Sequence, residues 1–180
     1  RGQQYGLPIQ PTSELLFCRQ DLFDAAGLSI PKTTDDVLFA ARMLHRSAFQ
    51  LSGIVMNFGR GTPVAHSFLQ TMADFGQPII NLAPLGLDFD VETIEGEQFR
   101  PMIQSEAGQQ AAEYLIELLQ YAHPGSLRSN WDRRIRTYAS GQAAMTYGWS
   151  IRAGLIENDD ASPAKGNTTY VAHPSGCSRR

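Results

Sequence analysis

The sequence is poor in cysteine: Cys18 and Cys177, near opposite ends of the chain, are the two in 180 residues. They show no metal-ligand spacing, and a disulfide between them can be neither argued nor excluded from sequence. Cys18 ends the apolar run at residues 15–18, where a buried and unreactive thiol is expected. The cysteines therefore leave the redox compartment undecided.

Strong charge and long apolar runs are also lacking. The 15 basic and 18 acidic residues give a formal net charge of −3, too mild to favour nucleic acid or an anionic membrane surface as a partner. No apolar segment approaches the roughly 20 residues that a transmembrane helix needs. The chain opens on RGQQ, without Met and without a charged-then-apolar leader. A mature secreted protein would look the same, but we expect a fragment of a longer protein.

Motifs of the common enzyme classes are missing. The sequence has no Gly-x-Ser-x-Gly elbow, no phosphate loop and no His-Glu-x-x-His helix, and its Gly-Arg-Gly at 59–61 lacks the third glycine of a dinucleotide fingerprint. The four histidines are scattered, with no carboxylate or cysteine at ligand spacing: His45, His66, His123 and His173. We therefore expect no enzyme, no metal and no cofactor.

One pair of acidic residues keeps an enzyme alternative open. Asp88 and Asp90 are close enough in sequence to serve as the two carboxylates of a glycosidase, and Glu157 is a further candidate. The pair lies in a stretch rich in proline and glycine, which favours a solvated loop. A glycan-active enzyme using these carboxylates is the alternative to a binding protein.

Hydrophobic patterning predicts alternating strands and helices. Apolar runs predict strands at 14–18, 50–58, 143–147 and 169–172, and amphipathic patterns predict helices at 19–27, 33–44, 64–75, 105–122 and 130–139. Residues 76–100 read as irregular with a small hairpin, and 151–156 as a short helical piece. This alternation indicates an α/β protein.

The stretch GQAAMTYGWS at 141–150 is the first candidate site. Gly141 ends a helix, and a small apolar strand follows. We expect Gly148 to turn the backbone and to present Trp149 at the carboxyl end of that strand, where ligands bind in open α/β sheets. The alternative is that Trp149 is a core residue.

Polar groups near two strand ends complete the candidate site. They are Asn57, Arg60, Thr62 and His66 on one loop and helix start, and Tyr147, Trp149, Ser150 and Arg152 on the other. Directional hydrogen bonds and a flat aromatic face suit a neutral polyhydroxylated ligand. Individually, Arg60 could be a solvated loop charge, His66 a helix-surface residue and Arg152 an ion-pair partner.

Four blocks, in order, resemble the family 1 extracellular solute-binding proteins of sugar-type ABC transporters, which include maltose-binding-like periplasmic proteins. They are YGLP at 5–8 with LFCRQDLFDAAGL at 16–28, PKTTDD at 31–36, SEAG at 105–108, and ASGQAAM at 139–145 followed by Trp149 and Ser150. The resemblance covers about residues 5–175. Cys18 and Thr34 depart from the tyrosine and tryptophan usual in the family, both at structural positions.

The resemblance implies one lobe of a type II periplasmic-binding-protein fold, with a mixed sheet flanked by helices. Residues 5–18 would be hinge or crossover strands, 19–156 the lobe body, and 157–180 a loop and return strand toward a missing lobe. Trp149 would stack on the sugar, and the loop at 60–66 would contact the ligand. The implied partners are a carbohydrate or polyol and the permease subunits of an ABC importer. The implied protein is a monomer in the periplasm or outside the cell, lipid-anchored if Gram-positive.

Overall fold

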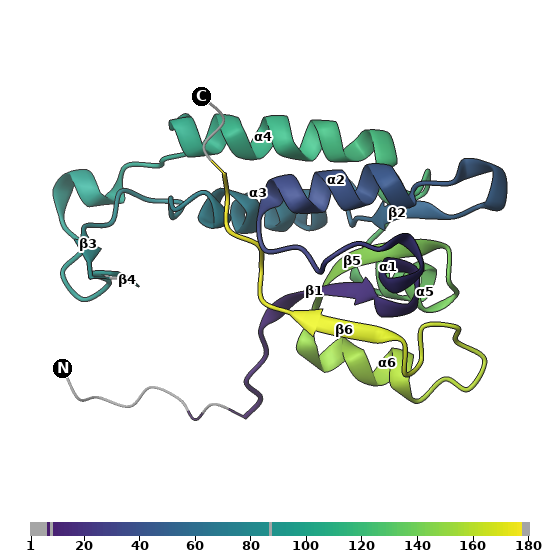
Figure 1. Ribbon diagram of the computed structural model, residues 1–180. Helices are drawn as coiled ribbons and strands as arrows, with labels where there is room; N and C mark the ends of the chain where they lie inside the picture. Colours follow the sequence, from purple (N-terminus) through teal and green to yellow (C-terminus); the bar gives the residue numbers. More distant parts are fainter. Residues whose placement is uncertain (1–6, 8, 87, 178–180) are drawn as a thin grey trace.

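The computed structural model describes residues 7, 9–86 and 88–177, so the extended segment expected at 5–8 lies mostly outside the described residues. A four-stranded sheet has the order β2-β5-β1-β6 (Figure 1). The strands are β1 (Glu14–Arg19), β2 (Ser52–Val55), β5 (Ala143–Trp149) and β6 (Thr168–Val171). β2 runs parallel to β5, whereas β1 runs antiparallel to β5 and β6. The sheet is therefore mixed.

Helices cover both faces of this sheet (Figure 1). They are α1 (Gln20–Ala26), α2 (Thr34–Leu44), α3 (Thr62–Asp74), α4 (Glu106–Leu118), α5 (Trp131–Ala139) and α6 (Gly154–Glu157), with short 3-10 helices η1 (Ser47–Phe49), η2 (Gly96–Phe99), η3 (Leu119–Tyr121), η4 (Ser126–Arg128) and η5 (Ser150–Ala153). α2 and α4 pack over one face, and α5 and α6 lie on the other. The predicted α/β class, a mixed sheet flanked by helices, is confirmed.

The alternation of side chains along β1 divides the core into two layers. Leu16 and Cys18 pack with α2 and α4, whereas Phe17 packs with Ile135 and Tyr138 of α5. This is the two-residue period of a strand that is buried on both faces. The layer that contains Phe17, Ile135 and Tyr138 packs near the end of β5, so it fixes the position of the candidate site.

Both cysteines are free thiols, Cys18 buried and Cys177 half-buried. Burial raises the pKa of the Cys18 thiol to about 12. Cys18 therefore stays protonated at neutral pH and behaves as a small apolar core residue, as its sequence context predicted. None of the helices in the described part of the chain is both long and apolar enough to cross a membrane.

The structure corrects the role expected of Gly148. The backbone does not turn there, because β5 continues through Gly148 to Trp149 and is paired with β1 from Met145 to Trp149. A Cβ at this position would lie 2.9 Å from Ile135 Cδ1 and 3.1 Å from the Phe17 ring. Close packing between sheet and helix, and not a turn, requires the glycine.

We therefore predict that Gly148→Ala destabilises the fold by about 1–3 kcal/mol, since the added methyl overpacks this layer. The measurement is denaturant unfolding of the full-length protein. Gly154→Ala is the matched control, because its Cβ would meet nothing closer than 3.7 Å, and it should be neutral or slightly stabilising. Equal stability of the two variants would refute the packing account.

Candidate functional site

Two tryptophans lie together at the carboxyl end of β5. Trp149 is the last residue of β5, and Trp131 is the first residue of α5. Their rings stack, with centroids 5.6 Å apart and planes inclined by 21°. The Asn130 side chain accepts a hydrogen bond from the Arg133 N–H at 2.9 Å and so fixes the start of α5. The paired rings, both half-buried, form a single aromatic wall.

His66, in the second turn of α3, joins this wall. Its ring lies nearly perpendicular to both tryptophans, with centroids 5.8 Å from Trp149 and 6.3 Å from Trp131. His66 Nε2 lies 3.3 Å from Glu14 Oε2. The histidine therefore links the aromatic wall to the first residue of β1.

A buried polar network continues from Glu14. Arg134 Nη2 lies 3.1 Å from Glu14 Oε1, and Arg134 Nη1 donates to Asn57 Oδ1 at 2.6 Å. The Ser67 hydroxyl donates to the same oxygen at 2.8 Å. Arg134 is 1% exposed. Burial lowers the pKa of Arg134, and the Glu14 carboxylate opposes this shift. The ion pair thus ties α5, β1 and the end of β2 together.

Several atoms of this cluster keep unused hydrogen-bonding capacity. Among the described residues, the buried Asn57 Nδ2, His66 Nδ1, Trp131 Nε1 and Arg134 Nε have no hydrogen-bond partner, and Glu14 Oε2 has only its ion-pair contact with His66 Nε2. The set contains both donors and acceptors. Leaving such groups unpaired costs about 1–3 kcal/mol each, so hydrogen bonds to water or to a polar ligand would stabilise them.

The predicted residues at the end of β5 fall on the rim of this cluster. The Ser150 hydroxyl accepts from the Ser13 N–H at 3.2 Å and lies 3.3 Å from Thr12 Oγ1. Arg152 pairs with Asp132, next to Trp131 in α5. Ser150 is thereby joined to the segment that leads into β1, and Arg152 takes the ion-pair role left open by the sequence.

The other predicted residues are more scattered. Arg60 is exposed, and Thr62 is the first residue of α3. Tyr147 is 4% exposed and lies in the core, where its hydroxyl is 3.0 Å from that of Tyr114. Burial raises the pKa of Tyr147 well above its usual range, and Tyr114 adds to the shift, so the phenol stays protonated. The structure thus brings Trp149, His66 and Ser150 to one place, and it buries Tyr147 beside Glu14 and Arg134 of the polar network.

Behind Tyr147, a small cavity of about 10 Å³ lies between the polar network and the segment that follows β6. His173 packs against the Tyr147 ring, and its Nδ1 donates to Asp74 at 2.9 Å. Burial raises the pKa of Asp74, and the hydrogen bond from His173 opposes the shift. A cavity of this size holds about one water molecule, so we assign it no larger ligand.

The sequence analysis missed Trp131, Arg134 and Glu14. Trp131 and Arg134 are three residues apart on α5 and therefore share a helix face, a signal that the sequence contained. Glu14 stands directly before the apolar residues of β1, where a charge needs a partner. Its partner, 120 residues away, gave no sequence signal.

The carboxylates of the enzyme alternative have local structural roles. Asp90 accepts from the N–H groups of Glu92 and Thr93 in a turn. Hydrogen bonds from the Thr93 hydroxyl and the Glu92 N–H lower the pKa of Asp90, which therefore stays ionised and suits no general acid. Glu157 accepts from the Tyr170 hydroxyl at 2.6 Å. The part of the chain that the structure describes contains no cluster of three metal-ligating side chains.

A mixed α/β sheet flanked by helices is the fold that this chain shares with solved solute-binding proteins. The chain belongs to the bacterial extracellular solute-binding protein family, whose model matches residues 1–176. The family consists of substrate-binding proteins, and the predicted resemblance is confirmed.

Individual relatives are distant and longer. The mannitol-binding protein of Pseudomonas aeruginosa is 22% identical over 178 residues, which are 97% of this chain and 37% of that protein. An ABC transporter solute-binding protein from Agrobacterium radiobacter, solved with ribitol, superposes with a TM-score of 0.80 at 25% identity, over 97% of this chain and 41% of its own. The corresponding protein from Agrobacterium vitis, solved with D-mannitol, gives 0.75 at 18% identity, over 91% and 37%. This chain thus spans about two fifths of the length of these relatives.

Proposed function

We propose that the full-length protein is the substrate-binding component of an ABC importer and captures a sugar or sugar alcohol between two lobes. This chain supplies one wall of the cleft. The observation that carries the proposal is the Trp131–Trp149 stack over the unpartnered atoms of the Glu14–Arg134 network. Aromatic faces pack on the C–H surface of a polyol, and mixed donors and acceptors suit its hydroxyls.

The proposed ligand-binding residues are Trp149, Ser150 and His66, with Trp131 and Glu14 added from the geometry. Arg152, Thr62, Arg60 and Tyr147 are further proposed ligand-binding residues. Residues 5–18 would serve as the hinge, 19–156 as the lobe body and 157–180 as the return toward the second lobe.

The proposed function is ligand capture without covalent chemistry. Domain closure around the ligand would signal to the permease subunits. The relatives solved with ribitol and D-mannitol support a polyol over a charged solute. The proposed state is a monomer in the periplasm or, in a Gram-positive cell, lipid-anchored outside the membrane.

A thermal-shift screen of the full-length protein tests the proposal. Ribitol, D-mannitol and maltose are the candidate ligands, and an amino acid and a sugar phosphate are charged controls. A ligand present at 100 times its Kd should stabilise the fold by about 2.7 kcal/mol. Stabilisation by the charged controls alone would contradict the proposal. Turnover of chromogenic glycosides that is lost in Asp88→Asn would favour the enzyme alternative.

A further inference from the structure

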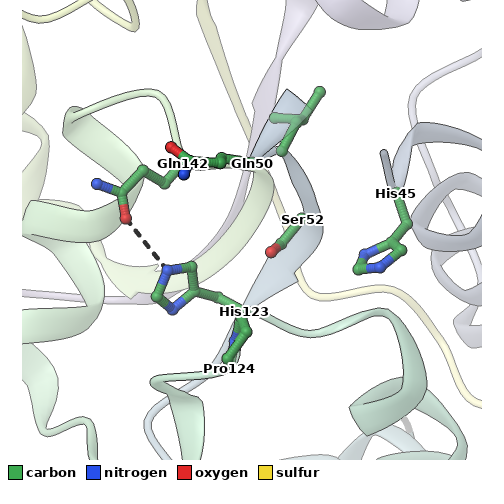
Figure 2. Close-up of a pocket in the computed structure, with 7 residues that line it drawn as sticks. His45, Gln50, Ser52, His123, Pro124 and Gln142 are labelled. Atoms are coloured by element: carbon green, nitrogen blue, oxygen red, sulfur yellow. Dashed lines mark hydrogen bonds between the residues drawn. The ribbon is translucent and has the colours of Figure 1, made fainter. Parts of the chain in front are cut away.

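A second, larger cavity lies at the opposite end of the sheet from the tryptophan pair. It measures about 410 Å³ and is lined by His45, Gln50, Leu51, Ser52, His123, Pro124 and Gln142 (Figure 2). Ser52 begins β2, and Gln142 directly precedes β5. The cavity therefore opens at the amino-terminal ends of these parallel strands, whereas Trp149 closes the carboxyl end of β5.

Backbone hydrogen bonds hold the walls of this far cavity. The Ser52 N–H donates to the Gln142 carbonyl at 2.9 Å, and the His123 N–H donates to the Ile54 carbonyl at 2.8 Å. Gln50 has a backbone φ of 55°. Within the described ranges, it is the one residue other than glycine with a positive φ. Left-handed backbone at a residue other than glycine is held by its surroundings and is common at ligand sites. The backbone thus fixes these walls of the cavity.

The histidine contacts determine which groups remain free. His123 Nδ1 accepts from the Gly125 N–H at 3.0 Å, so Nε2 carries the hydrogen and donates to Gln142 Oε1 at 3.1 Å. The Gln142 amide nitrogen has no further hydrogen bond within the described residues. His45 Nδ1 lies 3.1 Å from the Tyr121 carbonyl oxygen and 3.4 Å from the Gly53 backbone nitrogen. Nε2 is therefore an acceptor in the tautomer that donates to Tyr121 and a donor in the tautomer that accepts from Gly53.

Ser52 supplies a hydroxyl to the cavity. The residue is 4% exposed, and its hydroxyl is not one of the buried atoms that lack a hydrogen-bond partner among the described residues. Figure 2 shows its oxygen directed into the space between the His45 and His123 rings. A hydroxyl can donate or accept a hydrogen bond, so it suits a ligand hydroxyl in this place.

None of the 7 lining residues is a carboxylate, a lysine or an arginine. We propose that the far cavity binds a small uncharged molecule with neighbouring hydroxyl groups. Gln142 donates to one hydroxyl, and His45 Nε2 and the Ser52 hydroxyl each donate to or accept from another. Its volume lies in the range of small-molecule sites. The inference stands apart from the proposed cleft, because the two sites lie at opposite ends of β5.

Ribitol titration of the full-length protein, followed by NMR of carbon-labelled histidine rings, tests the far cavity. The His45 and His123 signals should shift saturably in the wild type and with the same apparent Kd in Trp149→Ala, which weakens binding in the cleft. Gln142→Ala, whose side chain is exposed, should weaken these shifts about tenfold in Kd, as should Ser52→Ala. Binding in the cleft should be unchanged in both.

Two outcomes would overturn the inference. The first is the absence of any shift at His45 and His123, as expected if another part of the full chain fills the cavity. The second is the loss of these shifts in Trp149→Ala, which would show that they report ligand binding in the cleft and not in the far cavity. Failure of the cleft proposal would give a different result. The histidine shifts would then persist, but no binding that depends on Trp149 would be seen.

Discussion

Trp149→Ala should weaken polyol binding by the full-length protein about 30-fold, which corresponds to about 2 kcal/mol. The indole is a large, rigid and half-buried surface, and its loss also leaves Trp131 without its stacking partner. Such residues dominate binding energies because they remove much apolar surface from water at little entropic cost. Isothermal titration calorimetry with the ligand found by thermal shift measures the effect.

Trp149→Phe is the matched control for this prediction. It keeps a flat apolar face at the end of β5 and should lose clearly less affinity than the alanine variant. Thermal unfolding of both variants separates loss of the ligand contact from loss of the fold. Wild-type affinity in Trp149→Ala would show that the tryptophan is a core residue, which was the alternative left open by the sequence.

Arg134→Met should destabilise the protein by about 3–5 kcal/mol. The substitution keeps most of the side-chain volume but leaves the Glu14 carboxylate, whose side chain is 5% exposed, without its nearest charge partner. It also removes the donor to Asn57 Oδ1. Breaking a buried pair costs this much because the remaining charge stays desolvated. Denaturant unfolding of the full-length protein measures the loss.

The double variant Glu14→Leu with Arg134→Met provides the control. Removing both charges together should recover most of the stability, since apolar replacement of a buried pair is often neutral. A loss of less than 1 kcal/mol in the single variant, or an equally large loss in the double variant, would refute the charge-pair account.

Local patterns made the fold predictable. The capping box formed by Thr33 and Asp36 begins α2 as the sequence indicated, and Gly27 and Gly141 have the positive φ values expected at helix ends. Short-range chemistry decides these features. Helix ends were less certain: α4 ends at Leu118 and continues as the 3-10 helix η3, four residues before the expected end at Ala122.

Long-range pairing decided what the sequence could not show. Glu14, Asn57 and Arg134 meet only because the strand order β2-β5-β1-β6 brings their elements together. Gly148 was misread for a related reason, since a glycine needed for close packing has the same sequence signature as one needed for a turn. The place of Trp149 at the carboxyl end of a buried strand was predictable, but its stack on Trp131 depends on how α5 packs against β5.

A crystal structure of the full-length protein with its polyol ligand tests the central claim most directly. We predict that the ligand lies between two lobes against the indole of Trp149, with its hydroxyls bonded to atoms of the cluster around Glu14, His66 and Trp131. A ligand bound elsewhere, with Trp149 covered by protein on both faces, would contradict the account.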